Sequence, residues 1–253
     1  SPGVFFDHDK GKTHASGKLL FNCRVIPNRG SWLDFEYDVK DFLYFKIDRK
    51  KKIFASSLLL ALGYSKSDIA NEFYDSEKYT FDTNSQKWKT TFNPDNYKTK
   101  NFSEEVIDAK SGKIIIKAGE KINFLNAKKL FDNGLKDILV AKESLYGKFL
   151  HTDIKINDEE GGVLKIGTEL NETLIQQILD AKIYSLKVAI TNSINKGGYL
   201  LTTIFNDKNN TKDEAITEIY KMLRPGEPPT TEIATQIFNN LFFSSDRYDL
   251  SDV

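Results

Sequence analysis

The densest group of side chains that could bind a metal ion or a phosphate lies near the start of the chain, in Asp7-His8-Asp9-Lys10-Gly11-Lys12-Thr13-His14. Its Gly11-Lys12-Thr13 matches the end of a phosphate-binding P-loop, but Phe6 stands where the motif requires a glycine. Four side chains are possible metal ligands: Asp7, His8, Asp9 and His14. The third histidine, His151, lies far along the chain and does not support them. We therefore interpret the segment as a solvated turn, with nucleotide or metal binding as the alternatives.

No other arrangement of residues predicts catalysis. Cys23 lies in an apolar run, where a packed thiol is the usual state. The chain has no nucleophile-elbow motif. Close acidic pairs occur only in alternating segments, where a solvated strand face is the usual interpretation. The residue chemistry alone therefore predicts a non-catalytic module, with no catalytic residue and no metal site.

Two short stretches have the chemistry of nucleic-acid contacts. Arg29-Gly30-Ser31-Trp32 places one of the two tryptophans just after a glycine turn, and an exposed tryptophan can stack on a base. The alternative is a tryptophan that fills the core below the turn. Asp48-Arg49-Lys50-Lys51-Lys52 contains four consecutive cations. They could follow a phosphate backbone, although a solvated face is the more common role of such a run.

A third stretch, Arg224–Thr230 (RPGEPPT), contains three of the six prolines and joins two segments with helical patterns. Proline fixes the backbone angle φ, so the sequence predicts a loop of defined shape. The loop carries one cation and one anion, Arg224 and Glu227. Arg224 could meet a phosphate, and Glu227 a base edge or a neighbouring protein segment.

The composition limits what such sites can do alone. The 253 residues include 36 lysines and arginines and 36 aspartates and glutamates, so the net charge is zero. Autonomous nucleic-acid binders usually carry a basic excess, because phosphate contacts provide much of their affinity. We therefore expect weak DNA binding by the isolated chain. No apolar run reaches about 18 residues, which predicts no membrane span, and the single cysteine is typical of a reducing compartment. We expect a cytoplasmic protein whose ends, starting at Ser1, are cuts in a longer polypeptide.

The elements that position these residues alternate between strands and helices. Strands are predicted at Leu19–Ile26, which we expect to be buried, at Trp32–Asp38 and at Leu43–Ile47. Helices are predicted in four places: Phe54–Leu62, a short helix capped by Ser65 and ending near Tyr74, a helix after the capping box Thr211–Glu214, and Thr231–Phe243.

Residues 75–195 contain a repeat with an offset of 48 residues. Gly119 pairs with Gly167 and Asp132 with Asp180, and the apolar positions agree in the two copies, at about 111–140 and 161–188. Each copy predicts a strand, a glycine turn, an amphipathic helix and a strand. The expected fold is α+β, with a host domain of residues 1–74 and 196–253 and an inserted α+β module of residues 75–195. Core packing explains most of the repeated apolar positions.

Five longer stretches together resemble the β subunit of bacterial RNA polymerase. They are SPGVFFD with the following GKTH and SGK, RGSWLDFE (Arg29–Glu36), IDRKKK (Ile47–Lys52), MLRPGEPPT (Met222–Thr230) and NLFFSSDRYDLSDV (Asn240–Val253). The resemblance covers both host segments in order and is weaker in residues 75–195. It departs from the family pattern at Ala15, where a second serine is frequent, and at Lys50, where arginine is usual.

The resemblance implies that the chain is the lobe of the β subunit, one jaw of the cleft that holds downstream DNA and the open bubble. Trp32 would stack on an unpaired base of the non-template strand, which favours an exposed side chain at this position. The other implied DNA contacts lie beside the base pocket and in the gate loop: Asp48, Arg49, Lys50, Arg224, Pro225, Gly226 and Glu227.

The resemblance also implies partners and a cofactor outside this chain. The partners are DNA (the non-template strand and the downstream duplex) and the β′, α, ω and sigma subunits, without a membrane. The catalytic Mg²⁺ would be held by β′, so this part of a nucleotidyltransferase carries no cofactor and is expected to be inactive alone. The alternative is a purely structural module whose insert docks transcription factors.

Overall fold

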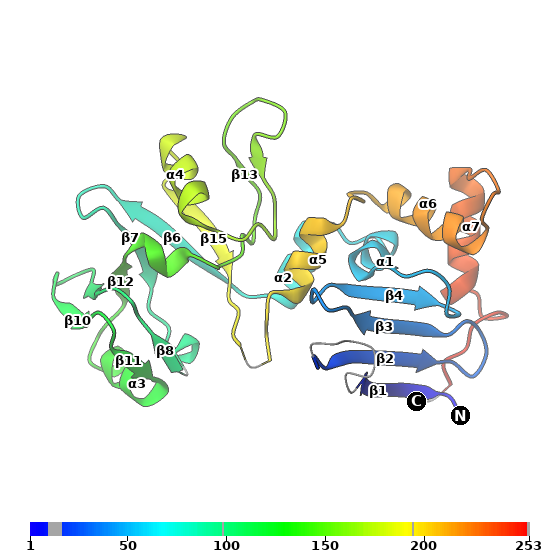
Figure 1. Ribbon diagram of the computed structural model, residues 1–253, viewed down its shortest axis with the longest axis horizontal. Coiled ribbons are helices and arrows are strands. Elements are labelled where there is room, and N and C mark those ends of the chain that lie inside the picture. The colour runs from blue at the N-terminus through cyan, green and yellow to red at the C-terminus, as the bar shows by residue number, and fades with distance from the viewer. Residues whose placement is uncertain (10–16, 98, 194, 252–253) are drawn as a thin grey trace. The chain divides into compact units, whose positions relative to one another are not determined.

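The computed structural model describes the chain except for residues 10–16, 98, 194 and 252–253, and it divides into two compact units (Figure 1). Unit 1 consists of residues 1–69 and 199–253, and unit 2 of residues 70–198. From the sequence we expected the divisions after residues 74 and 195. Both units combine helices with antiparallel strands, which confirms the α+β fold class.

Unit 1 is built on a five-stranded antiparallel sheet in which neighbouring strands follow one another along the chain. Its strands are β1 (Gly3–Asp9), β2 (Leu20–Ile26), β3 (Leu33–Tyr37), β4 (Leu43–Ile47) and β5 (Ile53–Phe54). The three predicted strands correspond to β2, β3 and β4. The prediction that β2 is buried was wrong, because Phe21 is 54% exposed and Asn22 is exposed as well. On one side β2 pairs with β1, which is the edge strand of the sheet, and this part of the sheet lies away from the core helices.

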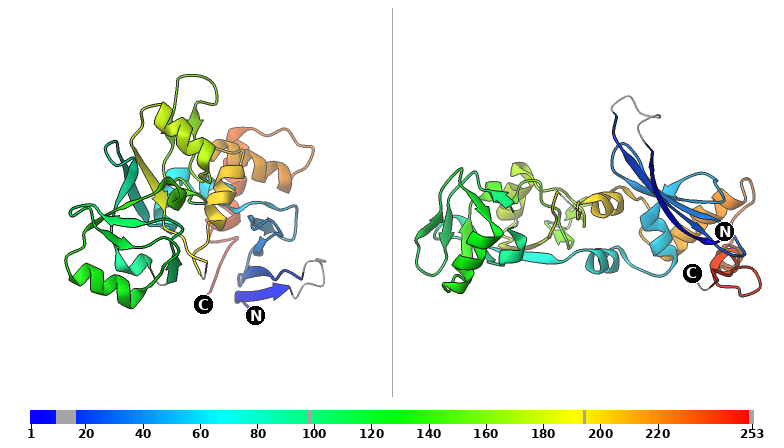
Figure 2. Two further views of the ribbon diagram at one scale, coloured as in Figure 1. Left: turned by 60° about the vertical axis from the view of Figure 1, so that its left-hand side comes forward. Right: turned by 90° about the horizontal axis from the view of Figure 1, so that it is seen from below.

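Three helices of unit 1 form its core together with β3, β4 and β5 (Figure 2). They are α1 (Ala55–Ala61), α6 (Lys212–Leu223) and α7 (Thr231–Phe242), and a fourth helix, α5 (Tyr199–Asn206), lies beside α1 and β4. Buried members of the core come from the sheet and from α1, α6 and α7, including Phe45, Ile47, Leu58, Ile219 and Phe238. The core therefore joins the two chain segments of unit 1.

Side-chain caps begin three of the helices, and two of the caps, Ser65 and Thr211, were predicted from the sequence. The Thr211 hydroxyl accepts a hydrogen bond from the Glu214 N–H (3.2 Å) at the start of α6. Thr230 makes the equivalent bond at α7, with Ile233 (3.3 Å). Ser65 caps α2 (Lys66–Phe73), a helix that crosses the division between the units, through the Asp68 N–H (3.0 Å). Such caps satisfy N–H groups that the first helical turn leaves unpaired.

Unit 2 has a six-stranded sheet with the order β10-β9-β12-β7-β6-β15. The strands of this sheet are β6 (Ser76–Asp82), β7 (Lys87–Thr91), β9 (Val106–Asp108), β10 (Ile114–Ile116), β12 (Asp137–Val140) and β15 (Ser185–Ala189). Two small sheets pair β8 (Thr99–Asn101) with β11 (Lys121–Asn123) and β13 (Ile154–Lys155) with β14 (Val163–Leu164). The helices are α3 (Phe124–Asp132) and α4 (Glu172–Asp180), with short 3₁₀ turns at Pro94–Asn96 and Lys142–Leu145.

The two copies of the repeat have the same backbone hydrogen bonds at the same offset. The Gly119 N–H donates to the Phe102 carbonyl (2.7 Å), and the Gly167 N–H to the Leu150 carbonyl (2.9 Å). Leu135 and Ile183 likewise donate to carbonyls five residues back, at the end of α3 and of α4 (both 3.1 Å). These equivalent bonds extend the repeat further toward the N-terminus than the starts at 111 and 161 expected from the sequence. The last strands of the copies, β12 and β15, pair with opposite sides of the β6–β7 hairpin.

Candidate functional site

Trp32 directly precedes β3 and is half-buried. The turn before it is held by the C-terminal segment, because the Arg29 N–H donates to the Asp249 carbonyl (3.1 Å) and the Arg29 guanidinium to the Ser245 carbonyl (2.9 Å). Gly30 has φ 122°, and a Cβ there would lie 2.5 Å from the ring of Tyr248. Only glycine fits this turn, so the backbone that presents Trp32 has a defined position.

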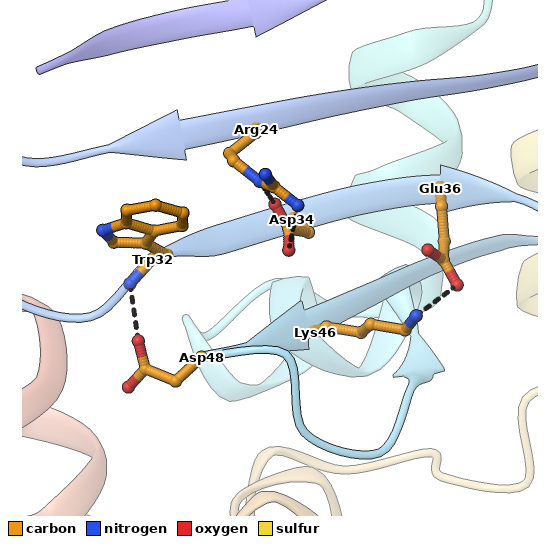
Figure 3. A network of polar contacts seen from close by, with 6 residues as sticks. All are labelled: Arg24, Trp32, Asp34, Glu36, Lys46 and Asp48. Carbon is orange, nitrogen blue, oxygen red and sulfur yellow. Dashed lines mark hydrogen bonds and ion pairs between the residues drawn. The ribbon is translucent and has the colours of Figure 1, made fainter. Parts of the chain in front are cut away.

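Asp48 fixes the backbone of Trp32 from the neighbouring strand end (Figure 3). Its carboxylate accepts a hydrogen bond from the Trp32 N–H (2.9 Å), and its own N–H donates to the Trp32 carbonyl (3.0 Å). Asp48 and Arg49 are consecutive residues with positive φ, 49° and 61°. This conformation is uncommon outside glycine and costs backbone energy. The Asp48 carboxylate and N–H are therefore both used to hold the backbone of Trp32.

Two guanidinium groups lie over the indole ring of Trp32. The Arg24 and Arg49 Cζ atoms are each 5.4 Å from the ring centroid, a distance at which cations are attracted to an aromatic face. Arg24 also forms a two-point ion pair with Asp34, at 2.6 Å and 3.4 Å (Figure 3). The hydrogen bond with Asp34 raises the pKa of the Arg24 guanidinium above its ordinary value. The ring thus has two cationic neighbours, and one of them, Arg24, is held by an ion pair.

The face of the sheet beside Trp32 forms a shallow hollow of about 620 Å³. Four cations line it: Arg24, Lys46, Arg49 and Lys52. Carboxylates of β3 balance part of this charge, because Asp34 pairs with Arg24 and Glu36 with Lys46 (3.0 Å) (Figure 3). The opposite side of β3 presents Leu33 and Phe35 to the core. The alternation of β3 therefore separates a core face from an ion-paired face.

The proline loop lies close to this region, through Lys50. The Lys50 ammonium donates to the carbonyl of Leu223 (3.2 Å), the last residue of α6. A small depression of about 260 Å³ also brings Gly30 and Ser31 together with Arg224. The structure thus gathers Trp32 and the residues of the loop in one region of unit 1.

Within the loop, the two charges that the sequence singled out pair with each other. Arg224 and Glu227 are 3.7 Å apart, and both side chains are about half exposed. The Tyr220 hydroxyl also donates to Glu227 (3.3 Å). Gly226 has φ 83°, which closes the turn between Pro225 and Glu227. Neither charge is held deep in protein, so a ligand could displace this exposed pair at small cost.

Arg24 and Asp34 belong to this site, and reasoning from the sequence did not find them. We interpreted the run Leu19–Ile26 as apolar and the acids of β3 as solvated, but Asp34 is only 7% exposed. The missed signal is the single arginine in that run, which lies directly across from Asp34 in the β2–β3 register. Cys23, its neighbour, is half-buried, and burial raises the pKa of the thiol, with a further contribution from Asp34.

The other candidate metal ligands that the structure describes do not form a cluster. Asp7, His8 and Asp9 lie in β1 and not in the turn expected for them. Gly11-Lys12-Thr13 and His14 lie outside the described residues. His151 is buried in unit 2, where its Nε2 is 3.1 Å from the carbonyl oxygens of Ala70 and Tyr74. Among the residues that the structure describes, no three His, Cys, Asp or Glu side chains form a group that could hold a metal ion.

None of the helices in the described part of the chain combines the length and the apolar character that crossing a membrane requires.

Comparison with known proteins identifies relatives along the whole chain. No family model matches the sequence. The chain is 44% identical over 253 residues to the "DNA-directed RNA polymerase subunit beta" of Rickettsia prowazekii and 45% identical to that of Rickettsia rickettsii. It is 44% identical over 265 aligned residues to the subunit of Dinoroseobacter shibae. Each alignment covers 100% of this chain but only 18% or 19% of the relative. Over its whole length the chain is therefore similar to a segment, about a fifth, of DNA-directed RNA polymerase β subunits.

Proposed function

We propose that the chain is the lobe of a polymerase β subunit and that its unit 1 holds the non-template strand of the transcription bubble during DNA-templated RNA synthesis. The observation that carries this proposal is Trp32, a half-buried indole with the guanidinium groups of Arg24 and Arg49 each 5.4 Å from its ring centre. Indole rings stack on bases of any sequence, and arginine adds contacts with phosphates and base faces. The chain contributes no chemistry at the bond-forming step in this proposal.

The residues of the site have different roles in this mechanism. Trp32 stacks on an unpaired base and Arg49 contacts the adjoining phosphate. Asp48 and Lys50 are positioning residues, because their side chains are bound to the backbone of Trp32 and of Leu223. Arg224 is released from Glu227 to reach a phosphate, while Pro225 and Gly226 keep the shape of the loop.

The rest of the enzyme supplies what this segment lacks. We propose that β′ holds the catalytic Mg²⁺ and that β′, α, ω and sigma complete a cytoplasmic nucleotidyltransferase. The balanced charge of this chain, 36 cations and 36 anions, is then sufficient, because basic neighbours attract the downstream duplex.

The test is a polymerase whose β subunit carries Trp32→Ala. The expected result is an open-complex lifetime reduced by about fivefold to a hundredfold, since stacking on one base is worth ~1–3 kcal/mol. The preference for bases near the start site should weaken as well. Trp88→Phe is the matched control, because Trp88 is fully buried in unit 2. An unchanged lifetime and an unchanged start-site preference would reject base stacking by Trp32 and favour the structural, protein-docking alternative.

A further inference from the structure

Helices α3 and α4 are the two copies of one repeated helix and have the same framework. Each spans nine residues and begins with an asparagine cap, in which Asn123 accepts from the Asn126 N–H and Asn171 from the Leu174 N–H, both at 2.9 Å. Their inward positions are alike, since Ala127 and its counterpart Ile175 are both buried. Because the two helices have the same length, cap and buried position, packing does not require their exposed residues to differ.

The outward faces differ in chemistry. Large apolar side chains are exposed on α3: Phe124 is 38% exposed, Leu125 68% and Phe131 49%. Two exposed lysines, Lys128 and Lys129, lie among them. The counterparts of Phe124, Leu125, Lys128 and Lys129 on α4 are all exposed and polar: Glu172, Thr173, Gln176 and Gln177. The counterpart of Phe131 is Leu179, which is apolar but half-buried. One scaffold thus carries an ordinary solvated surface in one copy and an apolar, basic surface in the other.

Helical geometry collects these side chains on one side of α3. Phe124, Lys128 and Phe131 are spaced at i, i+4 and i+7 and therefore point in similar directions, with Leu125 beside them. Isolated exposed apolar residues are common, but a cluster with polar surroundings is typical of an interaction site. We name this set, with Lys129, the α3 face.

We propose that the α3 face docks an acidic amphipathic helical segment of a partner protein. The apolar side chains supply anchors of the kind that a helix places against an apolar surface at spacings of three and four residues. Lys128 and Lys129 supply the charge complementary to acidic flanks, and Lys121 and Lys136 precede and follow the helix. Asp132 is the one carboxylate within α3, whereas α4 has two carboxylates and no cation.

The most exposed side chain favours a protein over a nucleic acid as the partner. Leu125 is aliphatic and has no ring on which a base could stack. This inference does not depend on the role of Trp32, because the α3 face lies wholly in unit 2 and Trp32 in unit 1.

The experiment transplants the surface of α4 onto α3 in the complete polymerase. The variant is Phe124→Glu, Leu125→Thr, Lys128→Gln and Lys129→Gln, residues that the same helix already accepts in the other copy. The probe is a labelled synthetic helix with leucine at i, i+4 and i+7 and glutamate on its flanks, and binding is measured by fluorescence anisotropy. We expect at least a tenfold loss of affinity. Thr173→Ala with Gln176→Ala on α4 is the control and should leave binding unchanged.

A single substitution, a probe of opposite charge and a competition with DNA distinguish the possible results. Leu125→Thr alone changes an exposed side chain and should weaken binding about threefold to tenfold without affecting folding. A probe with lysine in place of glutamate should not bind. Equal affinity of the transplanted and original polymerases would overturn the proposal, as would equal binding of the two probes. Displacement of the acidic probe by single-stranded DNA would also overturn it and would assign the α3 face to nucleic acid.

Discussion

Asp48 shows how one side chain can control the position of another without contacting its ring. We predict that Asp48→Ala loosens Trp32, because the substitution removes the acceptor of the Trp32 N–H at 2.9 Å. The cost should be ~1 kcal/mol, the usual net value of one hydrogen bond. The measurement is acrylamide quenching and fluorescence anisotropy of Trp32 in a Trp88→Phe background, where quenching should increase and anisotropy decrease.

Asp48→Asn is the control for this prediction, because an amide oxygen can still accept from the Trp32 N–H. It should resemble the unsubstituted chain in both measurements. If Asp48→Ala left quenching and anisotropy unchanged, the anchoring role of Asp48 would be wrong.

We predict that Lys100 makes the stability of unit 2 dependent on pH. Desolvation, with a further contribution from the like charge of Lys148, lowers the pKa of Lys100 to about 8, while Glu77 acts in the opposite direction. Above pH 8 the folded chain has released this proton, whereas the unfolded chain retains it until about pH 10.5. The unfolded state then binds more protons, so the free energy of unfolding should rise with pH between about 8 and 10.

The measurement is the urea midpoint of Trp88 emission at pH 7.5, 8.5 and 9.5, about the window in which Lys100 titrates. Lys100→Met should remove the rise. Above about pH 10 the rise should reverse, because burial raises the pKa of Tyr79 and of Tyr97, and the unfolded chain then loses tyrosine protons first. An equal rise in Lys100→Met would show that another group causes it.

At the site, the sequence was informative about residue types and less so about their partners. Trp32 and the basic run stand out by composition, and the structure places them together. The bonds that occupy Asp48 and Lys50 could not be predicted, because they depend on a positive-φ turn and on the end of α6. The half-burial of Arg24 against Asp34 depends on which residues of β2 and β3 lie opposite each other, and the alternation of β3 alone does not identify its partner on β2.

At the scale of elements, α3 and α4 allow a direct test of whether equivalent helix caps contribute equally to stability. We predict that Asn123→Ala and Asn171→Ala destabilise unit 2 by similar amounts, ~1 kcal/mol each, because both asparagines accept the same cap bond at 2.9 Å. The measurement is chemical denaturation followed by Trp88 emission. Asn126→Ala, an exposed substitution within α3, is the control for loss of an asparagine without loss of a cap acceptor. Costs that differ by more than about 1 kcal/mol would contradict the equivalence.

Periodicity predicted elements best where one face is buried. The alternation in Trp32–Asp38, the capping box at Thr211–Glu214 and the helical pattern of Thr231–Phe243 correspond to β3, α6 and α7. β1 was missed, because Phe5 and Phe6 are 48% and 82% exposed and give no alternating pattern. The early part of each repeat copy, near Phe102 and near Leu150, was missed as well. Its equivalence lies in backbone hydrogen bonds, which leave little trace in residue type.

For the whole molecule, separate cores predict separate unfolding. Each unit has its own buried cluster and one of the two tryptophans. We predict that Ile138→Ala, which removes a fully buried side chain of unit 2, lowers the free energy of unfolding reported by Trp88 by ~2–5 kcal/mol. The transition reported by Trp32, measured with Trp88→Phe, should keep its midpoint. A shift of both midpoints together would indicate one cooperative unit.

The division of unit 1 into two chain segments has a consequence for synthesis on the ribosome. Phe45 and Ile47 of its sheet are made early, but the α6 and α7 residues that cover them follow only after all of unit 2. Unit 2 has its complete set of residues when residue 198 has been added, so it can fold while the sheet of unit 1 still exposes its apolar side. Unit 1 is therefore begun first and completed last. Until translation passes α7, the nascent chain presents to chaperones the apolar side of the unit 1 sheet, which the finished protein hides.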